Sequence, residues 1–153
     1  MESFSSKELR KINYLISEYE WLYHELALKF NLTDSSMKIL YAICDIGEPT
    51  QIKDICKHTA TSKQTINSAL RKLEIENIIY LKFSNGKSKN VFLTDKGKLL
   101  VEKTVKKIIL IENEIFNSWS KEELEVYFRL LEKYNYQFKD KIKMMEEIKW
   151  FVY

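Results

Sequence analysis

The N-terminal part of the chain is patterned as two amphipathic helices. Apolar side chains recur three and four residues apart, at Leu9, Ile12, Ile16, Tyr19, Tyr23, Leu26 and Phe30. This spacing predicts a helix of about six turns that ends near Asn31. A shorter helix is predicted from Asp34, with Thr33 as its N-cap and Gly47 at its end. Its inward-facing positions are Met37, Leu40, Tyr41 and Cys44.

The C-terminal part carries the same kind of pattern. Ser120 to Glu123 fit a capping box, so a helix is predicted to begin there. Along it, a seam of positions four and three apart runs through Leu124, Phe128, Leu131, Asn135, Phe138, Ile142 and Met145. Upstream, Thr94 is predicted to cap another long helix. The apolar positions of that helix are Val101, Val105, Ile108, Ile111 and Ile115.

The middle of the chain is rich in turns, because all three glycines and the single proline lie between residues 47 and 97. Thr50 is predicted to cap a short helix with Ile52, Ile55 and Cys56 on one face, followed by a tight break at residues 57–61. A second capping box, Thr61 to Gln64, opens a helix whose apolar positions are Ile66, Ala69, Leu70 and Leu73. Two short helices joined by a tight turn form a helix-turn-helix.

Two segments of alternating polarity follow, residues 79–83 and 90–94, and an Asn-Gly turn signal lies between them. They predict a two-stranded wing behind the helix-turn-helix. The fold class is therefore mostly α (α+β), a winged helix-turn-helix with long N- and C-terminal helices. We expect one domain over residues 1–153, with a winged lobe at 33–97 and flanking dimerisation helices at 5–31 and 98–153.

Composition narrows the function classes. The chain is 45% hydrophobic and 13% aromatic, enough to build a core. Three glycines and one proline are too few for sandwiches, barrels or glycine-rich phosphate loops, and no G-x-G-x-x-G or P-loop occurs. Cys44 and Cys56 read as reduced core thiols, and the sequence has neither a long apolar run nor a secretory leader. A cytoplasmic protein without a membrane partner is expected.

Residues 55–73 and the wing exit at residues 91–97 resemble the MarR family of multiple-antibiotic-resistance regulators, and the order of elements does so along nearly the whole chain. The resemblance implies a two-fold dimer, triangular in outline, that binds palindromic promoter DNA. The wing departs from the family, whose wings commonly carry Asp-x-Arg. Asn85 and Lys87 occupy those positions here. Because lysine lacks the planar arginine fork, we expect weaker minor-groove readout and phosphate contacts from the wing lysines.

The predicted recognition helix supports DNA binding on physical grounds. If its apolar positions are buried, its other face presents hydrogen-bond donors, and Gln and Asn suit adenine edges in the major groove. The residues expected at base edges are Lys63, Gln64, Asn67 and Ser68. Those expected at phosphates or in the wing contact are Thr50, Ser62, Thr65, Arg71, Lys72, Lys87, Ser88 and Lys89. Residues 59–89 hold six cations and two anions, so this segment carries +4 of a net charge of +3.

The long helices carry more apolar surface than a lobe of about 60 residues can cover, which favours a homodimer. The expected interface residues are Leu9, Ile12, Ile16, Phe128, Leu131, Phe138, Ile142 and Met145. Packing of the same stripes within one chain is the alternative.

Other chemistry finds little support. No catalytic motif occurs, so no enzyme, catalytic residue or cofactor is expected. His24 and His58 are isolated, and neither a metal site nor a reactive thiol is predicted. The family resemblance implies a small aromatic or anionic effector, and Tyr19, Trp21, Tyr23 and Tyr41 could line its crevice. Ordinary core and interface packing explains these rings more simply, so no ligand residue is assigned.

The sequence therefore predicts a sequence-specific, DNA-binding transcriptional regulator, a homodimeric repressor on a palindromic operator. A winged-helix dimer used for protein–protein interaction, without an operator, is one alternative. A ligand-binding or metal-sequestering dimer is another.

Overall fold

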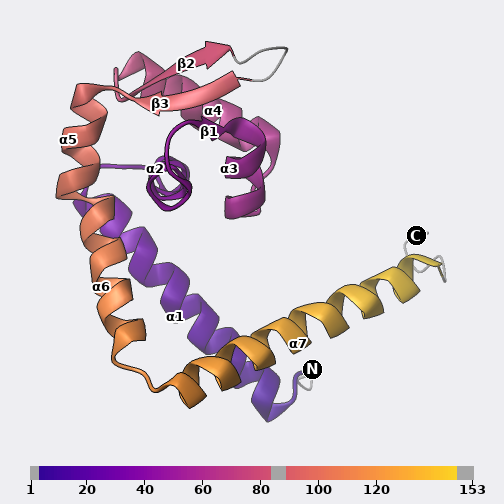
Figure 1. Cartoon of the computed structure of the whole chain (residues 1–153). Helices are drawn as coiled ribbons and strands as arrows, with labels where there is room; N and C mark the ends of the chain where they lie inside the picture. Colours follow the sequence, from indigo (N-terminus) through magenta and orange to yellow (C-terminus); the bar gives the residue numbers. More distant parts are fainter. Residues whose placement is uncertain (1–3, 84–88, 148–153) are drawn as a thin grey trace. The chain divides into compact units, whose positions relative to one another are not determined.

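The computed structural model describes residues 4–83 and 89–147, with side chains up to residue 145. The chain divides into two compact units, residues 1–108 and 109–153 (Figure 1). The elements of the first unit are α1 (Lys7–Lys29), α2 (Asp34–Ile46), β1 (Thr50–Gln51), α3 (Ile52–Thr59), α4 (Lys63–Ile75), β2 (Ile79–Phe83), β3 (Lys89–Leu93) and α5 (Asp95–Lys103). Helix α6 (Val105–Asn117) spans the boundary, and α7 (Lys121–Glu147) lies in the second unit.

Side-chain caps explain where most of these helices begin. Ser6, Thr33, Ser62 and Thr94 each accept a hydrogen bond from the backbone N–H three residues ahead. The predicted capping box at α7 is confirmed, since the Ser120 N–H donates to the Glu123 carboxylate over 2.7 Å and the Glu123 N–H donates to Ser120 Oγ over 3.1 Å. The helix α4 begins one residue later than its predicted box, because Ser62 and not Thr61 is the cap.

The sheet has three antiparallel strands in the order β1-β3-β2. The predicted wing strands are confirmed, and Tyr80 lies opposite Phe92 in their register. The sequence did not predict β1, which pairs Thr50 with Val91. The Glu48 carboxylate accepts a hydrogen bond from the Leu93 N–H and fastens the loop before β1 to the far end of β3.

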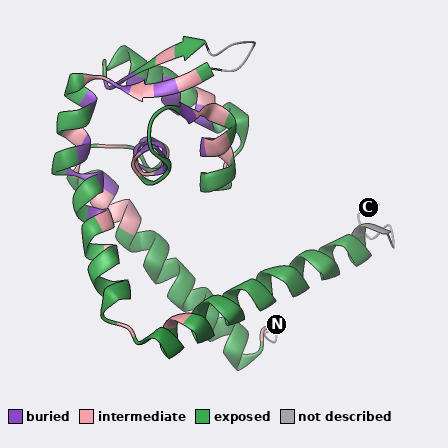
Figure 2. Ribbon diagram, viewed as in Figure 1, coloured by how far each residue is buried: buried purple, intermediate pink, exposed green. Residues whose placement is uncertain are grey.

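The core of the first unit forms where α2 meets the helix-turn-helix and the sheet (Figure 2). Its fully buried large side chains are Ile39, Leu40, Ile43, Ile55, Ile66, Leu70, Leu73, Ile79, Val91 and Val105. The predicted inward faces of α2 and α4 are therefore confirmed at Leu40, Ile66 and Leu70.

The prediction of one long helix after Thr94 is wrong in one respect, because the helix is broken at Thr104. That residue leaves the helical region at φ −127°, ψ −94°, and its hydroxyl donates to the Leu100 carbonyl over 2.7 Å. A threonine hydroxyl that bonds the backbone in this way competes with the helical ladder, so α5 ends and α6 begins.

In the second unit, an aromatic cluster packs the end of α6 and the following turn against α7. The rings of Trp119 and Tyr127 meet edge to face with centroids 5.3 Å apart, and Phe116 stacks on Phe128 at 6.3 Å. No helix in the described part of the chain is long and apolar enough to cross a membrane.

Gly97 lies close against the backbone of Ile78. A Cβ built there would lie 2.0 Å from the Ile78 carbonyl oxygen. Alanine in a helix normally stabilises relative to glycine by about 0.4–1 kcal/mol. Here we expect Gly97→Ala to lower the free energy of unfolding by about 1–3 kcal/mol instead, because the backbone of Ile78 must move. Urea unfolding measures it, with Lys98→Ala on the same helix as a control that should change stability by less than about 0.5 kcal/mol.

Candidate nucleic-acid interface

The helix α4 exposes the face that the sequence assigned to DNA. Ile66, Leu70 and Leu73 are buried on its inner side. The predicted contact residues on the other side are exposed, apart from the half-buried Asn67: Lys63, Gln64, Thr65, Ser68, Arg71 and Lys72. The subunit's own chain therefore leaves this polar face open over the width of a helix, which is what entry into a major groove requires.

The N-terminus of α4 has the hydrogen-bond donors and the positive potential that favour an anion. Ser62 Oγ accepts from the Thr65 N–H over 3.2 Å and lies 2.9 Å from Thr65 Oγ1. The N–H groups of a first helical turn have no intrahelical acceptor, and the helix dipole adds positive potential there. Ser62, Thr65 and the first N–H groups of α4 thus form one donor-rich end.

Two of the predicted polar residues, Ser68 and Lys72, already have side-chain partners in or next to α4. The Ser68 hydroxyl donates to the Gln64 carbonyl over 3.1 Å, which leaves its oxygen as an acceptor. Lys72 Nζ lies 3.9 Å from a Glu76 carboxylate oxygen in an exposed pair, a weak interaction that a phosphate can replace. Gln64, one turn before Ser68, and Arg71, next to Lys72, are also exposed.

Thr50 is a correction to the predicted contact set. It is 0% exposed, it lies in β1, and its hydroxyl donates to the Gly47 carbonyl over 2.6 Å. It does not cap α3 either, because Gln51 occupies the N-cap without a side-chain bond. Thr50 was predicted to cap α3 because a threonine just before a helix is typical of an N-cap. In the structure its backbone pairs with β3 instead.

The wing is described only in part. The predicted contacts Lys87 and Ser88 lie outside the described residues, whereas Lys89 is exposed at the start of β3. Its ammonium lies 5.1 Å from the ring centroid of Phe83, a residue that the sequence-based prediction did not single out. The signal in the sequence was a large apolar side chain at the last position of an alternating strand.

A groove of about 910 Å³ lies between α1, α2 and α3. Its walls include all four aromatic residues named as crevice candidates, Tyr19, Trp21, Tyr23 and Tyr41. The pKa of the Tyr41 phenol is raised, mainly by burial and to a smaller extent by Asp45 and Tyr19. The hydroxyl therefore stays protonated and can donate a hydrogen bond.

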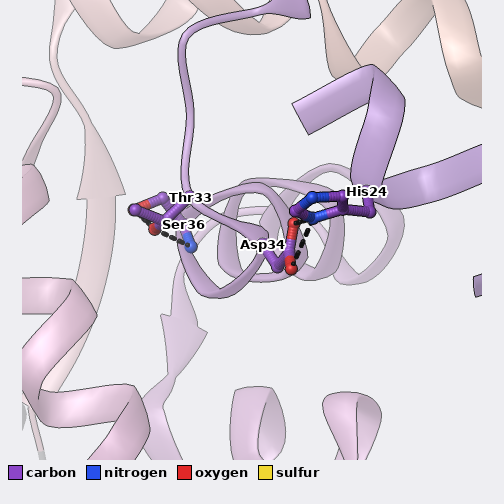
Figure 3. Close-up of polar contacts among 4 residues, drawn as sticks. All are labelled: His24, Thr33, Asp34 and Ser36. Atoms are coloured by element: carbon purple, nitrogen blue, oxygen red, sulfur yellow. Dashed lines mark hydrogen bonds and ion pairs between the residues drawn. The ribbon is translucent and has the colours of Figure 1, made fainter. Parts of the chain in front are cut away.

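Histidine–aspartate pairs join α2 to both neighbouring helices beside this groove. His24 Nδ1 on α1 lies 3.0 Å from each carboxylate oxygen of Asp34 at the start of α2 (Figure 3). His58 Nε2 on α3 lies 2.8 Å from Asp45 near the end of α2. Both histidines are therefore held by hydrogen bonds to carboxylates.

Neither cysteine forms a disulfide, and both are half-buried. Burial, with added repulsion from Glu102 and Glu48, raises the pKa of the Cys44 thiol, which makes it a poor nucleophile. In the described ranges, no three His, Cys, Asp or Glu side chains are grouped so that they could hold a metal ion.

The predicted dimer stripes are uncovered. On α1, Leu9, Ile12 and Ile16 are exposed. On α7, no side chain from 121 to 145 is buried, and the exposed apolar seam runs through Phe128, Leu131, Phe138, Ile142 and Met145. Each unit therefore presents an apolar helix face that its own residues do not cover.

A helix-turn-helix followed by an antiparallel wing defines a winged helix-turn-helix protein. No protein-family model and no curated protein matches the sequence. Solved structures do resemble the chain. The S. aureus MepR–DNA complex is 23% identical with a TM-score of 0.65, covering 89% of this chain and 99% of that chain. The transcription regulator MarR from Oenococcus oeni is 19% identical with a TM-score of 0.66, covering 81% and 95%.

A third similar structure is that of Bordetella bronchiseptica BpsR, whose DNA binding is regulated by 6-hydroxynicotinic acid. It is 20% identical, with a TM-score of 0.59, and the match covers 82% of this chain and 98% of that chain. The chain has the winged-helix fold of these MarR-family structures, and the predicted fold class is confirmed.

Proposed function

We propose that the protein is a sequence-specific DNA-binding transcription regulator, a repressor that acts as a homodimer on a palindromic operator. The observation that carries the proposal is the open polar face of α4, whose rotation is fixed by its buried side. The solved complex of the similar MepR with DNA supports the same function. In a dimer, the two α4 helices would enter successive major grooves about 34–36 Å apart.

Base readout is assigned to Lys63, Gln64, Asn67 and Ser68, which occupy the first two turns of α4. Phosphate contact is assigned to Ser62, Thr65, Arg71, Lys72 and the wing residues Lys87, Ser88 and Lys89. Thr50 is removed from this set because its hydroxyl is buried and bonded. The net charge of +4 over residues 59–89 supports contact with the DNA backbone.

DNA binding is measured on two duplexes. One is selected by the protein from random sequences, and the other is a random duplex that serves as the reference. Gln64→Ala and Asn67→Ala should each reduce the preference for the selected duplex by about 1–3 kcal/mol, because each removes a base-edge hydrogen bond. Arg71→Ala should weaken binding to both duplexes alike. It should also reduce by about one unit the slope of the logarithm of the binding constant against the logarithm of the salt concentration. Competition binding at two salt concentrations separates these effects.

Thr50→Val is the matched control for that series, since it should cost stability but leave the DNA affinity of the folded protein unchanged. Equal losses on both duplexes from Asn67→Ala would contradict its assigned role. If the wild-type protein selects no duplex, the alternative of a protein–protein interaction module replaces the regulator.

The apolar stripes of α1 and α7 are tested separately, each with one variant. Ile12→Glu on α1 and Phe138→Glu on α7 should each shift the protein from dimer to monomer at micromolar concentration, because a carboxylate would be buried unpaired in the interface. Sedimentation equilibrium measures the change. Tyr136→Glu, on the same helix but off the seam, should remain a dimer, and a monomeric wild-type protein would refute the interface.

We also propose that the protein responds to a small aromatic or anionic effector, and the groove supports this. Aromatic rings suit a flat ligand, and Lys38, which also lines the groove, supplies a cation for an acidic group. A ligand there can act only by binding one arrangement of the helices better than another.

6-Hydroxynicotinic acid, which regulates BpsR, is the first probe. We expect it to weaken operator binding by the wild-type protein, and Tyr41→Ala to lower its affinity about tenfold or more by removing a wall of the groove. Calorimetry measures that affinity, with Tyr136→Ala on α7 as a control that should bind normally. Equal affinity for wild-type and Tyr41→Ala protein would contradict a site in the groove.

A further inference from the structure

Phe83 and Lys89 form the last described residue pair on either side of the wing turn. They lie directly opposite each other in the β2–β3 ladder, and Lys89 Nζ is 5.1 Å from the centroid of the Phe83 ring. An ammonium within about 6 Å of an aromatic face is attracted by the negative potential of the ring. The register and this attraction together place the cation over the ring.

The pair lies on the side of the sheet that faces the helices. Opposite residues in an antiparallel ladder project to the same face, and every second residue along a strand shares that face. Phe83 thus shares a face with Ile79, and Lys89 shares it with Val91 and Leu93, all three of which are buried. The Phe83–Lys89 pair continues this face beyond the core, on the side that carries α4.

Packing against the described residues does not account for a phenylalanine at this position. The side chain of Phe83 is 73% exposed, so most of the free energy available from burying its ring is not gained in the free protein. Among the described residues, the Lys89 ammonium lies over its ring. A lysine that is free to rotate loses considerable side-chain entropy when a phosphate fixes it, and a ring that already restricts it reduces that loss.

We propose that Phe83 is a positioning residue for DNA binding. It holds the Lys89 ammonium where it meets a backbone phosphate beside the groove entered by α4. The partner is duplex DNA, whose backbone phosphates are the anions that the ammonium meets. This inference rests on the proposed function and adds a residue that carries no charge and reads no base.

The wing contains its own matched control. Lys82 Nζ lies 5.3 Å from the Tyr80 ring centroid and 5.6 Å from that of Phe92, and these two rings stack with centroids 5.2 Å apart. Tyr80, Lys82 and Phe92 project to the opposite face of the sheet, away from the helices. The same chemistry is therefore present on both faces, and of these two described clusters the Phe83–Lys89 pair is the one on the side of α4.

The test is a double-mutant cycle on operator binding, with the duplex that the wild-type protein selects. Phe83→Ala should weaken binding about threefold, and this loss should disappear in the Lys89→Ala background, because the ring acts through the ammonium. Lys89→Ala should lower the salt slope by about one unit. Phe83→Trp should bind like the wild type, whereas Phe83→Leu, apolar but without a ring, should bind like Phe83→Ala. Lys82→Ala should change affinity less than twofold.

Additive losses in the cycle, full binding by Phe83→Leu, or equal losses from Lys82→Ala and Lys89→Ala would each overturn the inference. Because Phe83 is exposed, the variants should fold, and their melting temperatures verify this. If the wild-type protein binds DNA and Phe83→Ala binds it equally well, this inference fails alone. If the wild-type protein binds no duplex, the proposed function fails with it.

Discussion

The burial of one side of α4 against α2 is the constraint on which the lobe depends. Each residue of a helix advances about 100°, so fixing Ile66, Leu70 and Leu73 in the core fixes the rotation of every other side chain. Gln64 and Arg71 must then project to the opposite side. A single sequence spacing thus supplies both the core contact and the polar face. Any substitution that rotates α4 would damage stability and the candidate interface together.

A second constraint joins the wing to the rest of the first unit. The Thr94 hydroxyl lies 2.7 Å from the Asn77 carbonyl and accepts from the Gly97 N–H over 3.0 Å. The end of β3, the turn after α4 and the start of α5 therefore meet at one side chain. The close approach of Gly97 to Ile78 belongs to the same junction. The position of the wing relative to α4 is set here, and the orientation of Phe83 and Lys89 follows from strand alternation alone.

The features that sequence predicted well have local signals. Thr33 and Ser120 cap helices because their hydroxyls bond N–H groups three residues away, which is visible in the sequence as a short motif. The missed strand β1 depends on pairing Thr50 with Val91, a contact across 41 positions that no local pattern contains. The break at Thr104 was missed for a different reason, since the apolar stripe continues through it at Val101 and Val105. The polar face of α4 was predictable because it is the complement of a buried stripe. The aromatic support of Lys89 was not, because it requires the cross-strand register.

The helix α2 connects the groove to the candidate DNA interface. Its buried side chains cover α4, while its Tyr41 lines the groove and its Asp34 and Asp45 hold histidines of α1 and α3. A ligand between these helices would therefore touch the element that fixes the rotation of α4. Coupling of this kind requires that the ligand bind two arrangements of α2 and its neighbours with different affinity. The two histidine–aspartate pairs lie at opposite ends of α2, so the apolar core that fixes α4 lies between them.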